Sequence, residues 1–236
     1  MALLDTGKGV DLVSSPLVIA IYTGRGLDQQ VAAAAAEILP GVELGSILDD
    51  RIIFDINRAG RITPPVVRRL LRYYLNAADA GAAVIFNTCS SIGELVAAGQ
   101  AAVDVPIVRI DAPMAAEAVE RFDRIGVLAT LPSTVEPTRR LIEETARRAG
   151  RDVSVQAEVA TGAYEALAAG DPAAHDERVR GAVKRLGDQV DGVALAQASM
   201  ARMHAELSET SPVPVLTSLR SGLRAVAAAL EGAPTP

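Results

Sequence analysis

The sequence predicts an α/β fold built from two pseudo-symmetric lobes, each with a mainly parallel sheet flanked by helices. Short runs rich in Val, Ile and Leu alternate with helical patterns, as expected when helices connect parallel strands. Half of the residues are hydrophobic but only 3% are aromatic, so small aliphatic side chains must fill the core. The alternation begins again after residue 110. We therefore expect a first lobe at 16–110, a second lobe at 111–217, and a ligand cleft between them.

The first half opens with LVIAIYT (17–23), an apolar run that ends at Gly24 and predicts a buried strand. The other elements expected in this half are a helix at 27–39, a strand at 52–56, a helix at 65–78, a strand at 82–86, a helix at 92–102 and a strand at 106–110.

The second half repeats this order, starting with a strand at IGVLA (125–129). A helix follows at 134–148, with Thr134 as its N-cap and Glu136 in its first turn. The other elements expected here are a strand at 153–159, a helix at 176–190, a strand at 193–196, a helix at 200–207, a strand at 213–216 and a helix at 218–230. The last helix is expected to complete the first lobe.

Two segments of the first half align with two of the second, which predicts an internal duplication. AVIFNTCSS (83–91) aligns with GVALAQASM (192–200), and IAIYTG (19–24) aligns with IGVLAT (125–130). Ligands of duplicated α/β proteins bind between the halves, beyond the carboxyl ends of the strands. The alignment places Ala198 opposite Cys89, and a shift of one residue would place Gln197 there instead.

Composition excludes several classes of partner. The formal net charge is −6 and the basic residues are scattered, so we expect no nucleic-acid partner. The apolar stretches are too short to cross a membrane, and the first residues do not have the pattern of a signal peptide. The single cysteine cannot form an internal disulfide, which makes the cytoplasm the simplest location. No metal-ligand spacing, phosphate loop or dinucleotide fingerprint is present, so neither metal nor cofactor is expected.

The segment Asn87-Thr88-Cys89-Ser90-Ser91 lies between an expected strand and an expected helix. A thiol at a helix N-terminus has its pKa lowered by the helix dipole and free N–H groups. The same N–H groups and the neighbouring hydroxyls bind a carboxylate. The alternative is a buried cysteine that acts as a small hydrophobic residue, with Ser90 and Ser91 only capping the helix. The polar strand-to-helix context favours the reactive thiol.

Further candidates lie where other strands end. Thr23 belongs to the turn at 22–26, whose glycines would let backbone amides approach a ligand; a simple tight turn explains them equally well. The corresponding residues of the second half are Thr130, Gln197, Ala198 and Ser199. Gln197 and Ser199 can donate hydrogen bonds into the cleft, although capping also explains the serine. His175, in a charged helical stretch, is expected to be solvated, and His204 is expected on the surface.

Together these features resemble the aspartate/glutamate racemase superfamily, which includes hydantoin racemases, maleate isomerases and arylmalonate decarboxylases. The resemblance rests on the duplicated halves, on NTCSS (87–91) and on LAQASM (195–200), and it covers roughly residues 17–230. It implies two Rossmann-like lobes, no organic cofactor and a small carboxylic-acid substrate such as an amino acid or a dicarboxylate. In the family's racemases each lobe carries one cysteine. One thiolate removes the α-proton and the other thiol protonates the opposite face.

Cys89 matches the first-lobe cysteine of this family, and Ser90 and Ser91 take the places of small polar residues that bind the substrate carboxylate. The second-lobe cysteine has no match, nor does the histidine that often follows it. Tyr22 and Thr23 stand where an acidic residue is common. The resemblance thus implies a one-thiol, cofactor-independent racemase or isomerase that uses thiol acid/base or nucleophilic chemistry. A single-thiol decarboxylase and a non-catalytic carboxylate-binding protein stay open, as does a homo-oligomer.

Overall fold

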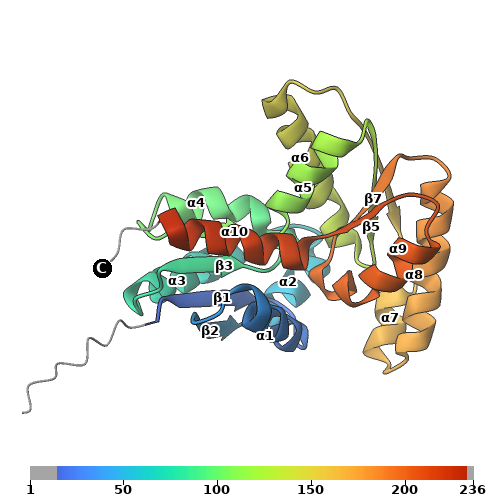
Figure 1. Ribbon diagram of the computed structural model, residues 1–236. Helices are drawn as coiled ribbons and strands as arrows, with labels where there is room; N and C mark the ends of the chain where they lie inside the picture. Colours follow the sequence, from blue (N-terminus) through green and yellow to red (C-terminus); the bar gives the residue numbers. More distant parts are fainter. Residues whose placement is uncertain (1–14, 233–236) are drawn as a thin grey trace, which may run out of the picture.

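Apolar strands of four to six residues form the centre of each half of the molecule. The computed structural model describes residues 15–232, and the N-terminal segment on which the signal-peptide prediction rests lies outside them. Two four-stranded parallel sheets have the same strand order, β2-β1-β3-β4 and β6-β5-β7-β8 (Figure 1). The predicted fold class, two pseudo-symmetric α/β lobes, is confirmed.

The first half consists of the first sheet and the helices that connect its strands, and its elements follow in chain order. They are β1 (Leu17–Tyr22), α1 (Leu27–Ile38), β2 (Glu43–Leu48), α2 (Arg51–Ala59), α3 (Pro64–Asp79), β3 (Val84–Asn87), the 3₁₀ helix η1 (Ser90–Leu95), α4 (Val96–Gln100) and β4 (Ile107–Arg109). The remaining elements are α5 (Ala112–Arg121), β5 (Arg124–Ala129), α6 (Pro132–Ala149), β6 (Ser154–Val159), α7 (Ala163–Ala168), α8 (Pro172–Gly187), β7 (Gly192–Leu195), the 3₁₀ helix η2 (Ala198–Met203), α9 (His204–Thr210), β8 (Val215–Thr217) and α10 (Ser218–Gly232).

The strand predicted at 52–56 is wrong, because this segment is the helix α2. Ile52 and Ile56 lie one helical turn apart and are both buried, which gives the helix its core face. The second strand of the sheet is β2, just before it. Its side chains are half-buried or exposed, as on the edge of a sheet, so it has no continuous apolar run to reveal it.

Three details of the helices also differ from the sequence prediction. Helix α6 begins at Pro132, so Thr134 is a buried residue inside the helix rather than its N-cap, and Glu136 lies beyond the first turn. Helices α5 and α7 were not predicted. The helices predicted at 92–102 and 200–207 each consist of a 3₁₀ helix followed by a short α-helix.

Matching backbone hydrogen bonds fix which residues of the two halves are equivalent. At the end of β3, the N–H of Thr88 donates to Ile21 O, and at the end of β7 the N–H of Ala196 donates to Leu128 O. Thr88 therefore corresponds to Ala196, and Cys89 corresponds to Gln197. The alignment of Cys89 with Ala198 is wrong by one residue. The methyl group of Ala198 instead packs in the core of the first half.

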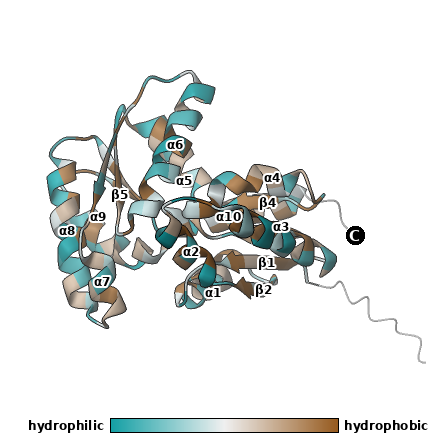
Figure 2. Ribbon diagram, turned by 180° about the vertical axis from the view of Figure 1, so that it is seen from behind, coloured by the Kyte–Doolittle hydropathy of each residue, from teal (hydrophilic) through white to brown (hydrophobic). Residues whose placement is uncertain are grey.

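The C-terminal helix α10 packs on the first sheet although it follows the last strand of the second (Figure 1). Leu219, Leu223 and Val226 join a core cluster with residues of β1, β3 and α1. In Figure 2 the central strand β1 is mainly hydrophobic, whereas the helices carry both hydrophilic and hydrophobic residues. Within residues 15–232, no helix combines the length and apolarity needed to cross a membrane.

The packing of α10 can be tested with alanine substitutions at two helical glycines, which should change the free energy of unfolding in opposite directions. A Cβ at Gly222 would lie 2.9 Å from Ile110 O, so Gly222→Ala should destabilise the fold by about 1–3 kcal/mol. A Cβ at Gly181 in α8 would meet only Arg185 Nη1, at 3.4 Å, so Gly181→Ala should stabilise by about 0.5–1 kcal/mol through helix propensity. Urea unfolding of both variants measures these changes. Equal effects at the two positions would contradict the packing of α10 on Ile110.

Candidate functional site

The carboxyl ends of the central strands of both sheets border one pocket of about 200 Å³. Parallel strands end at the same edge of a sheet, and loops at that edge form ligand sites in α/β proteins. The pocket brings together nine of the ten predicted site residues: Thr23, Thr88, Cys89, Ser90, Ser91, Thr130, Gln197, Ala198 and Ser199. Sequence reasoning missed several other wall residues, notably Ile53 of α2 and Tyr164 and Leu167 of α7.

Cys89 has extended backbone at φ −121° and ψ 115° and occupies the N-cap position of η1. The thiol is half-buried and borders the pocket. Burial is the largest influence on it and raises the pKa of Cys89. Hydrogen bonds from the hydroxyl of Thr23 and from the N–H groups of Ser91 and Ile92 act in the opposite direction but do not outweigh burial.

The lowered thiol pKa predicted from the sequence is therefore wrong for this structure. The helix after Cys89 is a six-residue 3₁₀ helix, so few peptide dipoles add up at its N-terminus. With a raised pKa, the thiol is protonated at neutral pH. In this state Cys89 is a proton donor rather than a base.

Asn87 is buried and does not belong to the pocket wall. Its side chain is buried, with Oδ1 accepting from Tyr74 Oη at 3.2 Å and Nδ2 donating to Cys89 O at 3.2 Å. Burial raises the pKa of Tyr74, so its hydroxyl remains a donor. The predicted substrate contact of Asn87 is thus replaced by a structural one, in which Tyr74 and Asn87 hold the turn that carries the thiol.

The hydroxyls beside Cys89 join the two halves at the pocket. Ser90 Oγ donates to Ala196 O at 3.1 Å, and Ser91 Oγ lies 3.3 Å from Thr134 Oγ1 of α6. Thr88 Oγ1 donates to Ile21 O at 2.7 Å within the first half. Because these hydroxyls already have partners, a bound carboxylate would rely on the first N–H groups of η1 and η2, those of Ser90, Ala198 and Ser199, since the N–H groups of Ile92 and Met200 donate to Cys89 O and Gln197 O.

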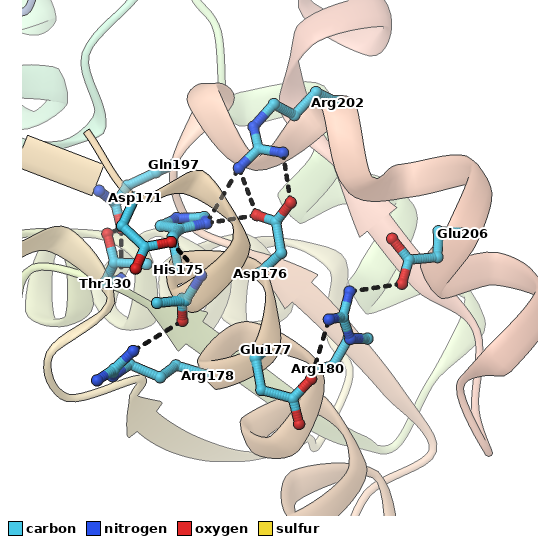
Figure 3. Close-up of polar contacts among 11 residues, drawn as sticks. Thr130, Asp171, His175, Asp176, Glu177, Arg178, Arg180, Gln197, Arg202 and Glu206 are labelled. Atoms are coloured by element: carbon cyan, nitrogen blue, oxygen red, sulfur yellow. Dashed lines mark hydrogen bonds and ion pairs between the residues drawn. The ribbon is translucent and has the colours of Figure 1, made fainter. Parts of the chain in front are cut away.

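Gln197 occupies the position equivalent to Cys89 and has a fixed orientation. Its backbone, at φ −120° and ψ 129°, is almost that of Cys89, and η2 follows it as η1 follows the cysteine. Its Oε1 accepts from the N–H of Thr130 at 2.5 Å and from Thr130 Oγ1 at 3.0 Å (Figure 3). Because the N–H of Thr130 can only donate, the side-chain atom of Gln197 that faces it must be the amide oxygen. The amide nitrogen of Gln197 therefore points away from Thr130. It offers two N–H donors to a ligand in the pocket.

His175 is buried, so the prediction that it is solvated is wrong. It is 2% exposed, and its Nδ1 lies 2.7 Å from Asp176 Oδ1 and 3.1 Å from Arg202 Nη2 (Figure 3). Arg202 Nη1 also donates to Asp176 Oδ2 at 2.7 Å, and this hydrogen bond holds the pKa of Asp176 below its usual range. The cluster ties η2 to α8 and so positions the segment after Gln197. His204 is exposed, as predicted.

Among the described residues, no group of three or more His, Cys, Asp or Glu side chains could hold a metal ion. The polar groups of the site are a thiol, hydroxyls, one carboxamide, the N–H groups at two helix starts and the guanidinium of Arg25, which is paired with Asp50. This arrangement can bind a carboxylate and donate a proton to an adjacent carbon.

The sequence model described as Asp/Glu/Hydantoin racemase matches residues 25–226. None of the curated protein sequences compared with the chain matches it significantly. Among solved structures, an allantoin racemase from Klebsiella pneumoniae is similar, with a TM-score of 0.68 and 19% identity over 94% of this chain and 91% of the other. A glutamate racemase from Bacillus anthracis has a TM-score of 0.68 and 16% identity over 92% and 82%. An unliganded arylmalonate decarboxylase has a TM-score of 0.57 and 16% identity over 92% and 93%.

The environment of Cys89 gives a prediction for its reactivity. Because burial raises its pKa, alkylation by iodoacetamide should be slow at neutral pH and should accelerate only above the pH at which an ordinary thiol ionises. Thr23→Val removes a hydrogen bond that favours the thiolate, so it should move the titration to still higher pH. The matched control is Thr161→Val, an exposed threonine outside the pocket, which should leave the titration unchanged. Fast alkylation at pH 7 would contradict the raised pKa.

Proposed function

Because the chain belongs to the Asp/Glu/hydantoin racemase family, we propose that it is a racemase- or isomerase-type enzyme that moves a proton at the carbon beside a carboxylate. The substrate is a small carboxylic acid, no organic cofactor takes part, and Cys89 is the catalytic acid and base. The observation that carries this proposal is the position of the only cysteine of the chain, at a strand end in the pocket between the sheets.

In the proposed mechanism, the N–H groups at the starts of η1 and η2 bind the substrate carboxylate. The amide nitrogen of Gln197 donates to an oxygen that becomes more negative as the α-carbon loses its proton, which stabilises the enediolate. The thiolate of Cys89 takes the α-proton, and when the resulting thiol returns a proton to the same face the α-hydrogen exchanges with retention of configuration. Net isomerisation then requires water to protonate the opposite face of the enediolate, or the proton to be returned to another atom of the substrate. Gln197 cannot donate a proton to the opposite face, because an amide does not ionise near neutral pH. The reaction of the thiol on this carbon is therefore one-sided.

A decarboxylase is the second candidate, and the raised pKa of Cys89 specifically supports it. When CO₂ leaves a malonate-type acid, the C–C bonding pair remains on the α-carbon as an enediolate. The S–H proton then passes to that carbon, and the thiolate takes a proton from water. This sequence needs the thiol in its protonated form at the start, whereas α-proton removal needs the thiolate. We further propose a cytoplasmic location, where a free thiol stays reduced.

Replacement of the thiol tests the first part of the proposal. Cys89→Ala should lower α-hydrogen exchange in D₂O, or CO₂ release from a malonate-type acid, by about 10²–10⁴-fold, because the catalytic acid is lost. NMR of α-deuterium and CO₂ detection measure the two reactions on a panel of carboxylic acids. Ser208→Ala, an exposed position outside this pocket, is the control and should retain full activity. Full activity of a folded Cys89→Ala protein would contradict a catalytic role for the thiol.

The pH dependence of turnover distinguishes the two candidates. If the thiol acts first as an acid, kcat is constant through neutral pH and falls as pH rises through the raised pKa of Cys89. If the thiolate acts first as a base, kcat rises over that same alkaline range. If kcat shows no Cys89-dependent change at alkaline pH, both candidate roles of the thiol are contradicted.

A further inference from the structure

A second, larger cavity continues outward from the pocket. It has a volume of about 840 Å³ and shares Thr23, Gly24, Arg25, Ile53, Tyr164 and Leu167 with the pocket wall. We call it the outer cavity. A ligand whose carboxylate binds at the helix starts beside Cys89 and Gln197 would extend its other end into this space.

Apolar side chains from both halves line the outer cavity. Phe54 of α2 is 49% exposed, and Tyr164 and Leu167 of α7 are 40% and 38% exposed. They are three of the five large hydrophobic side chains that the described part of the chain exposes. Such a cluster around one cavity, unlike scattered surface residues, is typical of a binding site. Arg51 lies 4.2 Å from the ring centroid of Phe54 and helps to hold the ring.

The burial pattern of helix α2 explains why Phe54 faces outward. Ile52 and Ile56 form its core face, so Ile53 and Phe54 project from a different side of the helix, toward the cavities. The core of the first half does not need Phe54, because the helix is already anchored by the two buried isoleucines. A large apolar residue at this position lowers the free energy only when something apolar covers it.

The charges in the pocket wall add a second constraint. Among the described residues that border the pocket, none is an aspartate or glutamate. The cationic Arg25 in this wall is paired with Asp50, at 2.7 Å. An α-ammonium group brought into the pocket would lose its hydration and meet no carboxylate, which is costly. The pocket therefore favours an acid that has no amino group.

We propose, on the basis of the function proposed above, that the substrate is a carboxylic acid without an amino group that carries an apolar, ring-sized substituent. The substituent binds between Phe54 of α2 and the pair Tyr164 and Leu167 of α7. These three residues determine specificity, whereas the helix starts and Gln197 bind the carboxylate.

Three carboxylic acids test the apolar substituent and the absence of an amino group separately. They are 3-phenylpropanoate, propanoate and phenylalanine. Ligand-detected NMR titration should give an affinity for 3-phenylpropanoate at least about tenfold higher than for propanoate, because the phenyl ring buries apolar area. Phenylalanine, which adds an ammonium group to the same skeleton, should bind at least about tenfold more weakly than 3-phenylpropanoate. Equal binding of 3-phenylpropanoate and propanoate, or of 3-phenylpropanoate and phenylalanine, overturns the proposal.

Leu167→Ala and Leu75→Ala are a matched pair of variants. Each variant truncates a leucine of similar exposure, 38% for Leu167 and 41% for Leu75. Leu75 is on α3 and lines neither cavity. Leu167→Ala should weaken 3-phenylpropanoate binding by about three- to tenfold without changing propanoate binding, and Phe54→Ala should do the same. Leu75→Ala should change neither. Loss of affinity for both probes in Leu167→Ala, or an equal loss in Leu75→Ala, overturns the assigned position of the substituent.

Cys89→Ala separates this proposal from the proposed function. If the apolar subsite is real, the preference for 3-phenylpropanoate persists in Cys89→Ala, because the residues that create it are intact. A persistent preference together with the absence of any Cys89-dependent reaction overturns the proposed function and supports the subsite. A Cys89-dependent reaction without a preference for 3-phenylpropanoate supports the proposed function and overturns the apolar subsite.

Discussion

The register of the two central strand pairs is the constraint on which the site depends. Each pair ends with one backbone hydrogen bond, Thr88 N–H to Ile21 O in the first half and Ala196 N–H to Leu128 O in the second. The next residue in each half, Cys89 or Gln197, therefore leaves its sheet with almost the same backbone angles. A one-residue slip would turn every side chain of a strand to the opposite face. Strand pairing thus brings these two side chains to one pocket.

Burial and hydrogen bonding act against each other on the thiol, and burial prevails. Next to Cys89, Ser90 Oγ donates to Ala196 O and links the turn that carries the thiol to the second half. On the opposite side, Thr130 fixes the amide of Gln197, so the pocket pairs a group that can transfer a proton with one that can only donate a hydrogen bond. This asymmetry within a symmetric fold is the physical basis for one-sided chemistry.

Much of the fold and half of the pocket wall were predictable from local sequence, because strand, polar turn and helix follow one another at Asn87–Ser91. The position of Gln197 was not, since short motifs do not fix an alignment to one residue and only the backbone hydrogen bonds do. The apolar lining of the outer cavity was missed because the sequence at Ile52–Ile56 resembles a strand and α7 is only six residues long. The contact of His175 with Arg202, 27 residues away, and the burial that raises the pKa of Cys89 both arise from tertiary packing, which short sequence motifs do not reveal.

A second thiol placed by substitution is the most direct test of the equivalence between Cys89 and Gln197. With a chiral substrate of the enzyme in D₂O, we expect Gln197→Cys to form both labelled enantiomers, because its thiol would reach the face opposite Cys89. Ala198→Cys should not, because that side chain packs in the core. Racemisation by Ala198→Cys and not by Gln197→Cys, with both proteins folded, would contradict the register of the strands and the account of the site built on it.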